Sequence, residues 1–184
     1  MTRQDVIAAL VRMLRPLGPE GDPAQREEEE AAWTTRAAGD STILAALLDL
    51  TRNPATENER GRISAEAFQE QLAHVLSLAG AFAPAAVIDR VGALTQALRA
   101  RATAIEVLGT IGDPAGLRWL VPLVDSGELS EDEASWLASS LGDIGTPEAR
   151  VLLDRLAART SREHAGVHRE IQIARDAIAR RTKT

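Results

Sequence analysis

Apolar residues along this chain recur mainly three and four positions apart. The segments LRWLVPLV and ARVLLDRLAA each carry one such stripe, formed by Leu117, Leu120, Val121 and Val124 in the first and by Leu152, Leu153 and Leu156 in the second. That spacing places the apolar side chains on one face of an α-helix. Aromatic residues make up only 3% of the chain, and no long stretch alternates apolar and polar residues, so strands are not expected. The pattern predicts an all-α protein.

Residues that begin and end helices separate these stripes. Asp22-Pro23, Asp113-Pro114 and Thr146-Pro147 each place a capping side chain before a proline that suits the first helical position. The segment from Ser130 to Glu133 has the spacing of a capping box. Glycines stand where the stripes stop, at Gly39, Gly80, Gly112, Gly127 and Gly145. Ten helices in five pairs are therefore predicted, at approximately 2–17, 24–38, 41–52, 64–79, 83–95, 97–111, 114–125, 130–144, 147–159 and 164–181.

One nine-residue pattern occurs twice. LGTIGDPAG runs from Leu108 to Gly116, and LGDIGTPEA runs from Leu141 to Ala149, thirty-three residues later. Each copy combines the end of one predicted helix, a tight turn and the start of the next helix. A period of this length indicates stacked two-helix units, each of which is too small to bury its apolar faces alone.

These segments resemble HEAT repeats, in particular the short bacterial type called PBS-lyase HEAT-like repeats. The resemblance is carried by ATAIEVLGTIGDPAGLRWLVPLV and LASSLGDIGTPEARVLLDRLA and is clear over about residues 97–160. It implies a right-handed α-solenoid of about five antiparallel helix pairs, related to armadillo folds. We expect one domain over 1–184, with a divergent part at 1–60, repeats at 61–160 and a C-terminal capping helix at 161–184.

The repeats depart from the family pattern in two places. The arginine and alanine typical of the second helix are present at Arg101-Ala102, but the equivalent pair is Ala134-Ser135. The first two predicted helix pairs carry no Leu-Gly-x-Ile-Gly segment.

Composition narrows the class of protein. The absence of cysteine excludes a disulfide framework, a thiolate nucleophile and a cysteine-ligated zinc site. No apolar run approaches the roughly 18–20 residues that span a bilayer, so we expect a cytoplasmic protein with no membrane partner. No nucleophile elbow, Walker loop or dinucleotide-binding glycine motif is present. These features favour a protein without a cofactor.

Charge is unevenly distributed along the chain. The net charge is −6, which argues against general affinity for nucleic-acid phosphates. Residues 113–148 hold eight acids and one base, whereas residues 150–184 hold nine bases and four acids. The basic segment alone supports nucleic-acid binding, and its alternation with acids favours a solvated end of the fold.

Trp136 is the principal candidate for partner binding. The apolar stripe of its predicted helix leaves it on a more polar side, together with Asp132, Glu133 and Ser140. An aromatic side chain off the core stripe is the type of anchor that dominates interface energetics. The alternative is that Trp136 packs against a neighbouring repeat.

For the other candidate residues, we favour a role in the structure over a role in binding. Trp119 lies among apolar neighbours and is expected in the core, and Trp33 is expected to anchor its helix to the next. REEEEAAW, from Arg26 to Trp33, is either an acidic patch for a basic partner or a solvated helix start. His164 and His168 are four apart and form a weak candidate metal pair, while His74 stands alone.

Three functions follow from these observations. The first is a non-enzymatic scaffold that binds another protein on the concave face of a solenoid. The second, implied by the resemblance alone, is a lyase or isomerase that attaches or detaches bilin chromophores. The third is a helical-repeat nucleic-acid-binding protein that uses the C-terminal arginines. We favour the first.

Overall fold

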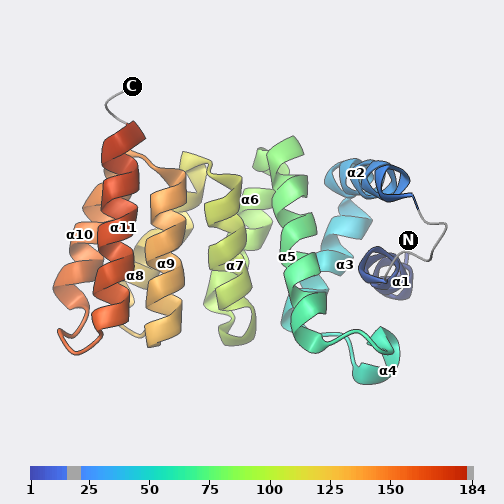
Figure 1. Ribbon diagram of the computed structural model, residues 1–184, viewed down its shortest axis with the longest axis horizontal. Coiled ribbons are helices and arrows are strands. Elements are labelled where there is room, and N and C mark those ends of the chain that lie inside the picture. Colours follow the sequence, from blue (N-terminus) through green and yellow to red (C-terminus); the bar gives the residue numbers. More distant parts are fainter. Residues whose placement is uncertain (16–21, 182–184) are drawn as a thin grey trace. The chain divides into compact units, whose positions relative to one another are not determined.

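The computed structural model describes residues 1–15 and 22–181, and these form helices and no strand. The elements are α1 (Arg3–Leu14), α2 (Pro23–Gly39), α3 (Ser41–Arg52), α4 (Glu57–Arg60), α5 (Ala65–Phe82), α6 (Pro84–Gly92), the 3₁₀ helix η1 (Ala93–Gln96), α7 (Leu98–Ile111), the 3₁₀ helix η2 (Pro114–Gly116), α8 (Leu117–Ser126), α9 (Glu131–Ile144), α10 (Pro147–Arg159) and α11 (Ala165–Arg181) (Figure 1). The all-α prediction is confirmed.

Each of the ten expected helices is present. The last two residues of the expected helix 2–17 lie outside the described residues. The sequence did not predict α4, a four-residue helix closed by a capping box between Thr56 and Glu59. It was missed because the prediction relied on apolar periodicity, and α4 has no buried residue.

The expected helix ends are largely confirmed. The side chains of Asp22, Asp113 and Thr146 accept hydrogen bonds from backbone N–H groups as caps, and the capping box from Ser130 to Glu133 is formed. Gly112, Gly127 and Gly145 adopt the left-handed conformation that a glycine C-cap favours. The prediction that a helix ends at Gly80 is wrong, because α5 continues past this residue to Phe82.

The chain divides into two compact units, Met1–Val87 and Ile88–Thr184. Their boundary falls within α6 and not at residue 60. The expected single domain over 1–184 therefore stays a prediction, and each unit is described by itself.

In the N-terminal unit, α5 packs against α1, α2 and α3. It contributes Phe68, Leu72 and Leu76, which are fully buried. Arg3 ties the start of α1 to the other elements: its guanidinium pairs with Asp49 at 3.2 Å and Glu59 at 2.5 Å. Apolar burial and this ion-pair cluster hold α1, α3 and α4 together.

The C-terminal unit contains a layer of three helices, α7, α9 and α11, in which α9 packs between the other two. These helices run side by side (Figure 1). The helices that alternate with them along the chain, α8 and α10, pack against each other. The α10 helix also contacts α9 and α11, so the three-helix layer is covered on one side.

Small residues in the repeated segment set the spacing of this layer. A Cβ atom at Gly109 would lie 2.6 Å from the Ser140 Cβ, and one at Gly142 would lie 2.8 Å from the Ala174 Cβ. Real Cβ atoms do not approach so closely, so both positions require glycine. The recurring Leu-Gly-x-Ile-Gly is thus explained: its first glycine lets the next helix of the three-helix layer approach, and its second ends the helix.

Ion pairs also join neighbouring helices of this unit. Arg118 of α8 pairs with Asp89, and Arg155 of α10 pairs with Asp125 at the end of α8. Arg175 of α11 pairs with Asp154 of α10 at 2.5 Å. Two of these pairs thus join helices that are next but one along the chain, α6 with α8 and α8 with α10, and the third joins α10 with α11.

Candidate functional site

Trp136 is exposed on the outer side of α9. Its side chain is 47% accessible, and the indole N–H has no hydrogen-bond partner among the residues that the structure describes. Asp132, Ser139 and Asp143 are also exposed, and their spacing from Trp136 places all four on one face of the helix. Because α7 and α11 cover the flanks of α9 and α10 contacts its inner side, this stripe is the surface that α9 leaves open. We call it the α9 stripe.

Two residues expected beside Trp136 belong instead to the contact between α7 and α9. Ser140 is 3% exposed, and its hydroxyl donates to the Ile105 carbonyl at 2.9 Å. Glu133 accepts the Ser130 backbone N–H at 2.9 Å and lies 3.6 Å from the Arg101 guanidinium. Both side chains are held inside the unit, so the expectation that they contact a partner is corrected. Asp132 remains on the exposed surface.

The other tryptophans are more enclosed. Trp119 is half-buried, its ring lies against Gly92, and its indole N–H donates to Asp89 at 3.2 Å. The Arg118 guanidinium stands 5.9 Å from the Trp119 ring centroid. Trp33 of α2 is also half-buried. Among the three tryptophans, the one at position 136 is therefore the most available to a partner.

An apolar residue that the sequence analysis missed lies on α11. Ile173 is 48% exposed, although the apolar stripe of α11, which includes Ile171 and Ile178, is buried. Its signal in the sequence was an isoleucine between two core positions, off the helical period. Together, the α9 stripe and the exposed residues of α7 and α11 form what we call the α7–α9–α11 face.

The Asp143 carboxyl at the end of the α9 stripe is electrostatically perturbed. Partial burial raises its pKa, and the charge of Arg181 opposes that rise. The Arg181 guanidinium also donates at 2.8 Å to the backbone carbonyls of Gly142 and Asp143. The end of α11 is thus attached to the C-terminal turn of α9.

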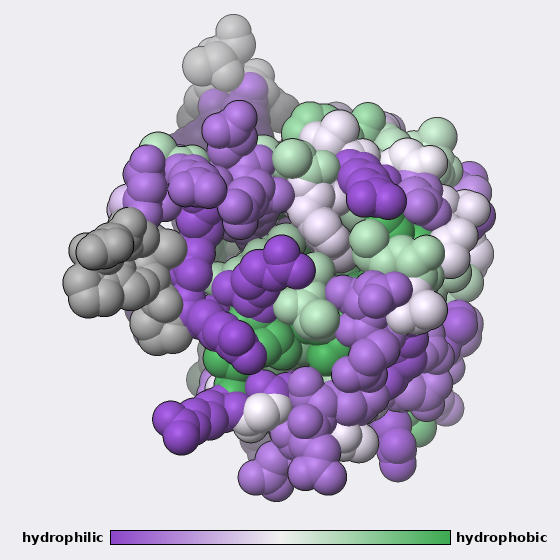
Figure 2. Space-filling model, turned by 90° about the vertical axis from the view of Figure 1, so that its right-hand side faces the viewer, coloured by the Kyte–Doolittle hydropathy of each residue, from purple (hydrophilic) through white to green (hydrophobic). Residues whose placement is uncertain are grey.

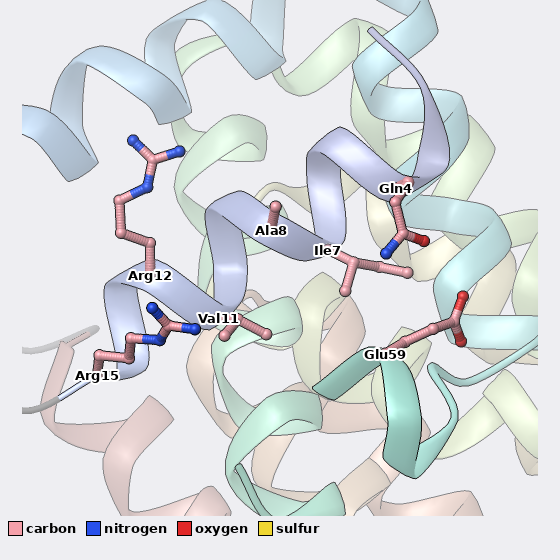
Figure 3. Close-up of a pocket in the computed structure, with 7 residues that line it drawn as sticks. All are labelled: Gln4, Ile7, Ala8, Val11, Arg12, Arg15 and Glu59. Carbon is pink, nitrogen blue, oxygen red and sulfur yellow. The ribbon is translucent and has the colours of Figure 1, made fainter. Parts of the chain in front are cut away.

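A second concave site lies on the N-terminal unit. It is a groove of about 410 Å³ beside α1, lined by Gln4, Ile7, Ala8, Val11, Arg12, Arg15 and Glu59 (Figure 3). Glu59 is already bound by Arg3 and by the Thr56 backbone N–H, which lowers the pKa of its carboxyl. Ile7 is fully buried, so the groove offers a ligand little apolar surface. In the view of Figure 2, mostly hydrophilic residues surround a small hydrophobic area.

The expected acidic patch is only partly available. Glu27, Glu28 and Glu29 of α2 are exposed. Glu30 instead accepts the Gln71 amide at 2.7 Å and lies 3.5 Å from the His74 imidazole. The last glutamate of the run therefore attaches α2 to α5, while the first three remain on the surface.

The two C-terminal histidines do not form a larger cluster. His164 precedes α11, and the His168 ring nitrogen Nε2 lies 3.2 Å from the Ser161 carbonyl oxygen. Over residues 1–15 and 22–181, no group of three or more His, Cys, Asp or Glu residues is arranged to hold a metal ion. The metal pair at His164 and His168 stays a weak candidate.

Many of the C-terminal arginines make contacts within the unit. Arg155 and Arg175 form the ion pairs described above, and Arg159 donates to the Asp125 carbonyl. Arg181 is held by α9. These arginines have structural partners, which leaves fewer of them available to bind phosphate groups.

In the part of the chain that is described, no helix combines the length and apolar character that crossing a bilayer requires. No protein-family model, curated protein or solved structure matches this chain.

Proposed function

We propose that the protein is a non-enzymatic scaffold that binds another protein through the α7–α9–α11 face, with Trp136 as the central anchor. One observation carries this proposal: a tryptophan that is 47% exposed lies at the middle of a helix whose other sides are packed. Tryptophan is enriched among the residues that dominate binding energy, especially near the centre of an interface. The indole N–H of Trp136, which has no hydrogen-bond partner among the described residues, adds a donor for a carbonyl of the bound protein.

The proposed architecture is a HEAT-like solenoid, in which the α7–α9–α11 face is the concave surface. Support comes from the alternation of the two sets of helices and from the repeated contact of Gly109 with Ser140 and of Gly142 with Ala174. A layer built by repeating one helix contact presents a continuous surface to a partner.

Selection of peptides from a random display library tests the proposal. We expect the intact protein to enrich peptides that bind Trp136→Ala at least about tenfold more weakly, because truncating an anchor costs 2 kcal/mol or more at such sites. Val151→Ala is the matched control, because Val151 is 57% exposed on α10, outside the three-helix layer. Binding that weakens equally in both variants, or in neither, contradicts the proposal.

A further inference from the structure

The carboxylates around Trp136 indicate the chemistry of its partner. Asp132 and Asp143 lie on the α9 stripe before and after Trp136. The exposed Asp132 forms no ion pair among the residues that the structure describes, and neither does the half-buried Glu170 of α11. A surface with exposed acids around an aromatic ring attracts a cation both by charge and by the negative face of the ring.

The contact between α9 and α11 places Glu170 beside Trp136. The helices α9 and α11 run in the same direction, because Glu131 is near Gly166 and Gly142 lies against Ala174. Counting back four residues from this second contact shows that Ala138 of α9 and Glu170 of α11 are at the same height. Trp136 is two residues from that height, or about 3 Å at the helical rise of 1.5 Å per residue. Neighbouring helix axes are about 8–10 Å apart. Glu170 is therefore about 10 Å from Trp136, backbone to backbone.

The two aspartates lie at comparable distances along α9. Asp132 is four residues before Trp136, about 6 Å along the axis, and Asp143 is seven residues after it, about 10 Å. Asp132, at about 6 Å, falls within the Debye length of about 8 Å at physiological salt, whereas Glu170 and Asp143, at about 10 Å, reach the indole at about 0.1 M salt or below. The charge of Arg181 partly offsets that of Asp143, so Asp132 is the main source of attraction at physiological salt.

Arg101 of α7 lies 3.6 Å from Glu133, three residues before Trp136, and is paired with that carboxylate. Two other arginines, Arg99 and Arg169, are exposed on α7 and α11. Arg169 is about 100° around α11 from Glu170, one turn before Ile173 on the exposed side of that helix. Gly109 of α7 contacts Ser140 of α9, so Arg99, ten residues before Gly109, is level with residue 130 of α9. At a rise of 1.5 Å per residue, that level is about 9 Å from the level of Trp136. Arg101 is held by its pair with Glu133, and no arginine among the described residues lies within cation–π distance of the Trp136 ring.

Elsewhere in the same unit, an arginine lies between a tryptophan ring and a carboxylate. At the contact between α6 and α8, the Arg118 guanidinium lies 5.9 Å from the Trp119 ring and pairs with Asp89. There, one arginine is shared between an indole and a carboxylate. At Trp136 the indole and the carboxylates are present, and over residues 1–15 and 22–181 no arginine is found over the ring.

We infer that the partner bound at Trp136 is a basic protein segment that places an arginine or lysine side chain over the indole and between the surrounding carboxylates. Ile173, 48% exposed on α11, provides an apolar contact beside the cation. This inference rests on the proposed function and specifies the class of partner.

The test uses three labelled peptides of equal length, in which alanine alternates with arginine, glutamine or glutamate. Their affinities for the full chain are measured by fluorescence anisotropy at low and physiological salt. We expect the arginine peptide to bind at least about tenfold more tightly than the glutamine peptide, with the difference shrinking as salt rises. Trp136→Ala should weaken the arginine peptide and leave the helical circular dichroism unchanged.

Charge variants separate a specific site from the general attraction of an acidic protein. Asp132→Asn combined with Glu170→Gln should weaken the arginine peptide about three- to tenfold, on the scale of two partly exposed charge pairs. Glu148→Gln on α10, an exposed acid outside the layer, should leave it unchanged. Equal weakening by both sets of variants, or no weakening by the pair, overturns the inference.

Failure of this inference is distinguishable from failure of the proposed function. If displayed peptides depend on Trp136 but are neutral or acidic, the face binds proteins and the inference about basic partners is wrong. If no selected peptide depends on Trp136, both are wrong.

Discussion

Gly142 of α9 lies directly against Ala174 of α11: a Cβ atom at position 142 would be 2.8 Å from the Ala174 Cβ and 3.0 Å from its Cα. The Ala174 backbone cannot yield as the end of a flexible side chain would. The spacing of the two helices, and with it the height of Glu170 relative to Trp136, therefore depends on the absence of one methyl group.

Substitution of Gly142 by alanine should destabilise the protein although alanine is the better helix former. The gain in helix propensity is about 1 kcal/mol, whereas overpacking at such a contact costs about 1–3 kcal/mol and must also separate two backbones. We expect a net loss of about 1–2 kcal/mol in urea unfolding. The control is Gly166→Ala on α11, where the nearest atom to a Cβ is a Glu131 carboxylate oxygen at 3.6 Å; this change should be neutral or stabilising. Equal effects of the two substitutions would contradict the close contact.

Trp136 and Trp119 should differ in their contribution to stability. Trp136→Ala should change the free energy of unfolding by less than about 0.5 kcal/mol, as an exposed substitution does. Trp119→Ala should cost about 2 kcal/mol, less than a fully buried tryptophan, because it loses the contact with Gly92 and the hydrogen bond to Asp89. Thermal melting of both variants measures this. A large loss for Trp136→Ala would place that side chain in the core and remove the binding site.

Ser140 and Ser139 are adjacent and should respond differently to alanine. Ser140→Ala removes the buried hydrogen bond to the Ile105 carbonyl, which we expect to cost about 1 kcal/mol in chemical denaturation. Ser139 is exposed, so Ser139→Ala should leave stability unchanged. The reverse order would mean that α9 is rotated relative to α7.

Acid should weaken the junction between α2 and α3 through Asp40. The backbone N–H of Thr42 donates to the Asp40 carboxylate and lowers its pKa. A carboxyl with a lowered pKa in the folded state stabilises the protein above its unfolded-state pKa of about 4, and this stability is lost as pH falls through the folded-state pKa. Asp40→Asn keeps a capping side chain but does not titrate there. The fall in the urea midpoint between pH 6 and pH 2 should therefore be smaller in the variant, and parallel curves would contradict this role.

Much of the secondary structure was predictable because its causes are local. The residues Asp113 and Gly112 identify a helix start and a helix end by their own chemistry, and both do so in the structure. Gly80 was misassigned because a glycine is compatible with a helix end but does not require one. The short α4 was missed because its cap, Thr56 with Glu59, was not accompanied by apolar periodicity.

The candidate site was predicted less completely. Helical periodicity correctly placed Trp136 off the core stripe, but it also grouped Ser140 and Glu133 with it. Those two polar residues face α7, where the Ile105 carbonyl and Arg101 satisfy them. A single helix pattern cannot reveal this, because a polar residue is buried or exposed according to the partner that a neighbouring helix brings to it.

The sequence by itself determined which segments are helices and where most of them begin and end, since capping, proline geometry and apolar spacing act over a few residues. It also determined that the Leu-Gly-x-Ile-Gly segment serves the same junction twice. Only the tertiary structure decided that Gly109 and Gly142 are points of close helix contact, that Ser140 is inside and that Trp136, Asp132 and Ile173 are outside. Those outcomes depend on the register between helices far apart in the chain, and that register is set by the packing of all of their side chains together.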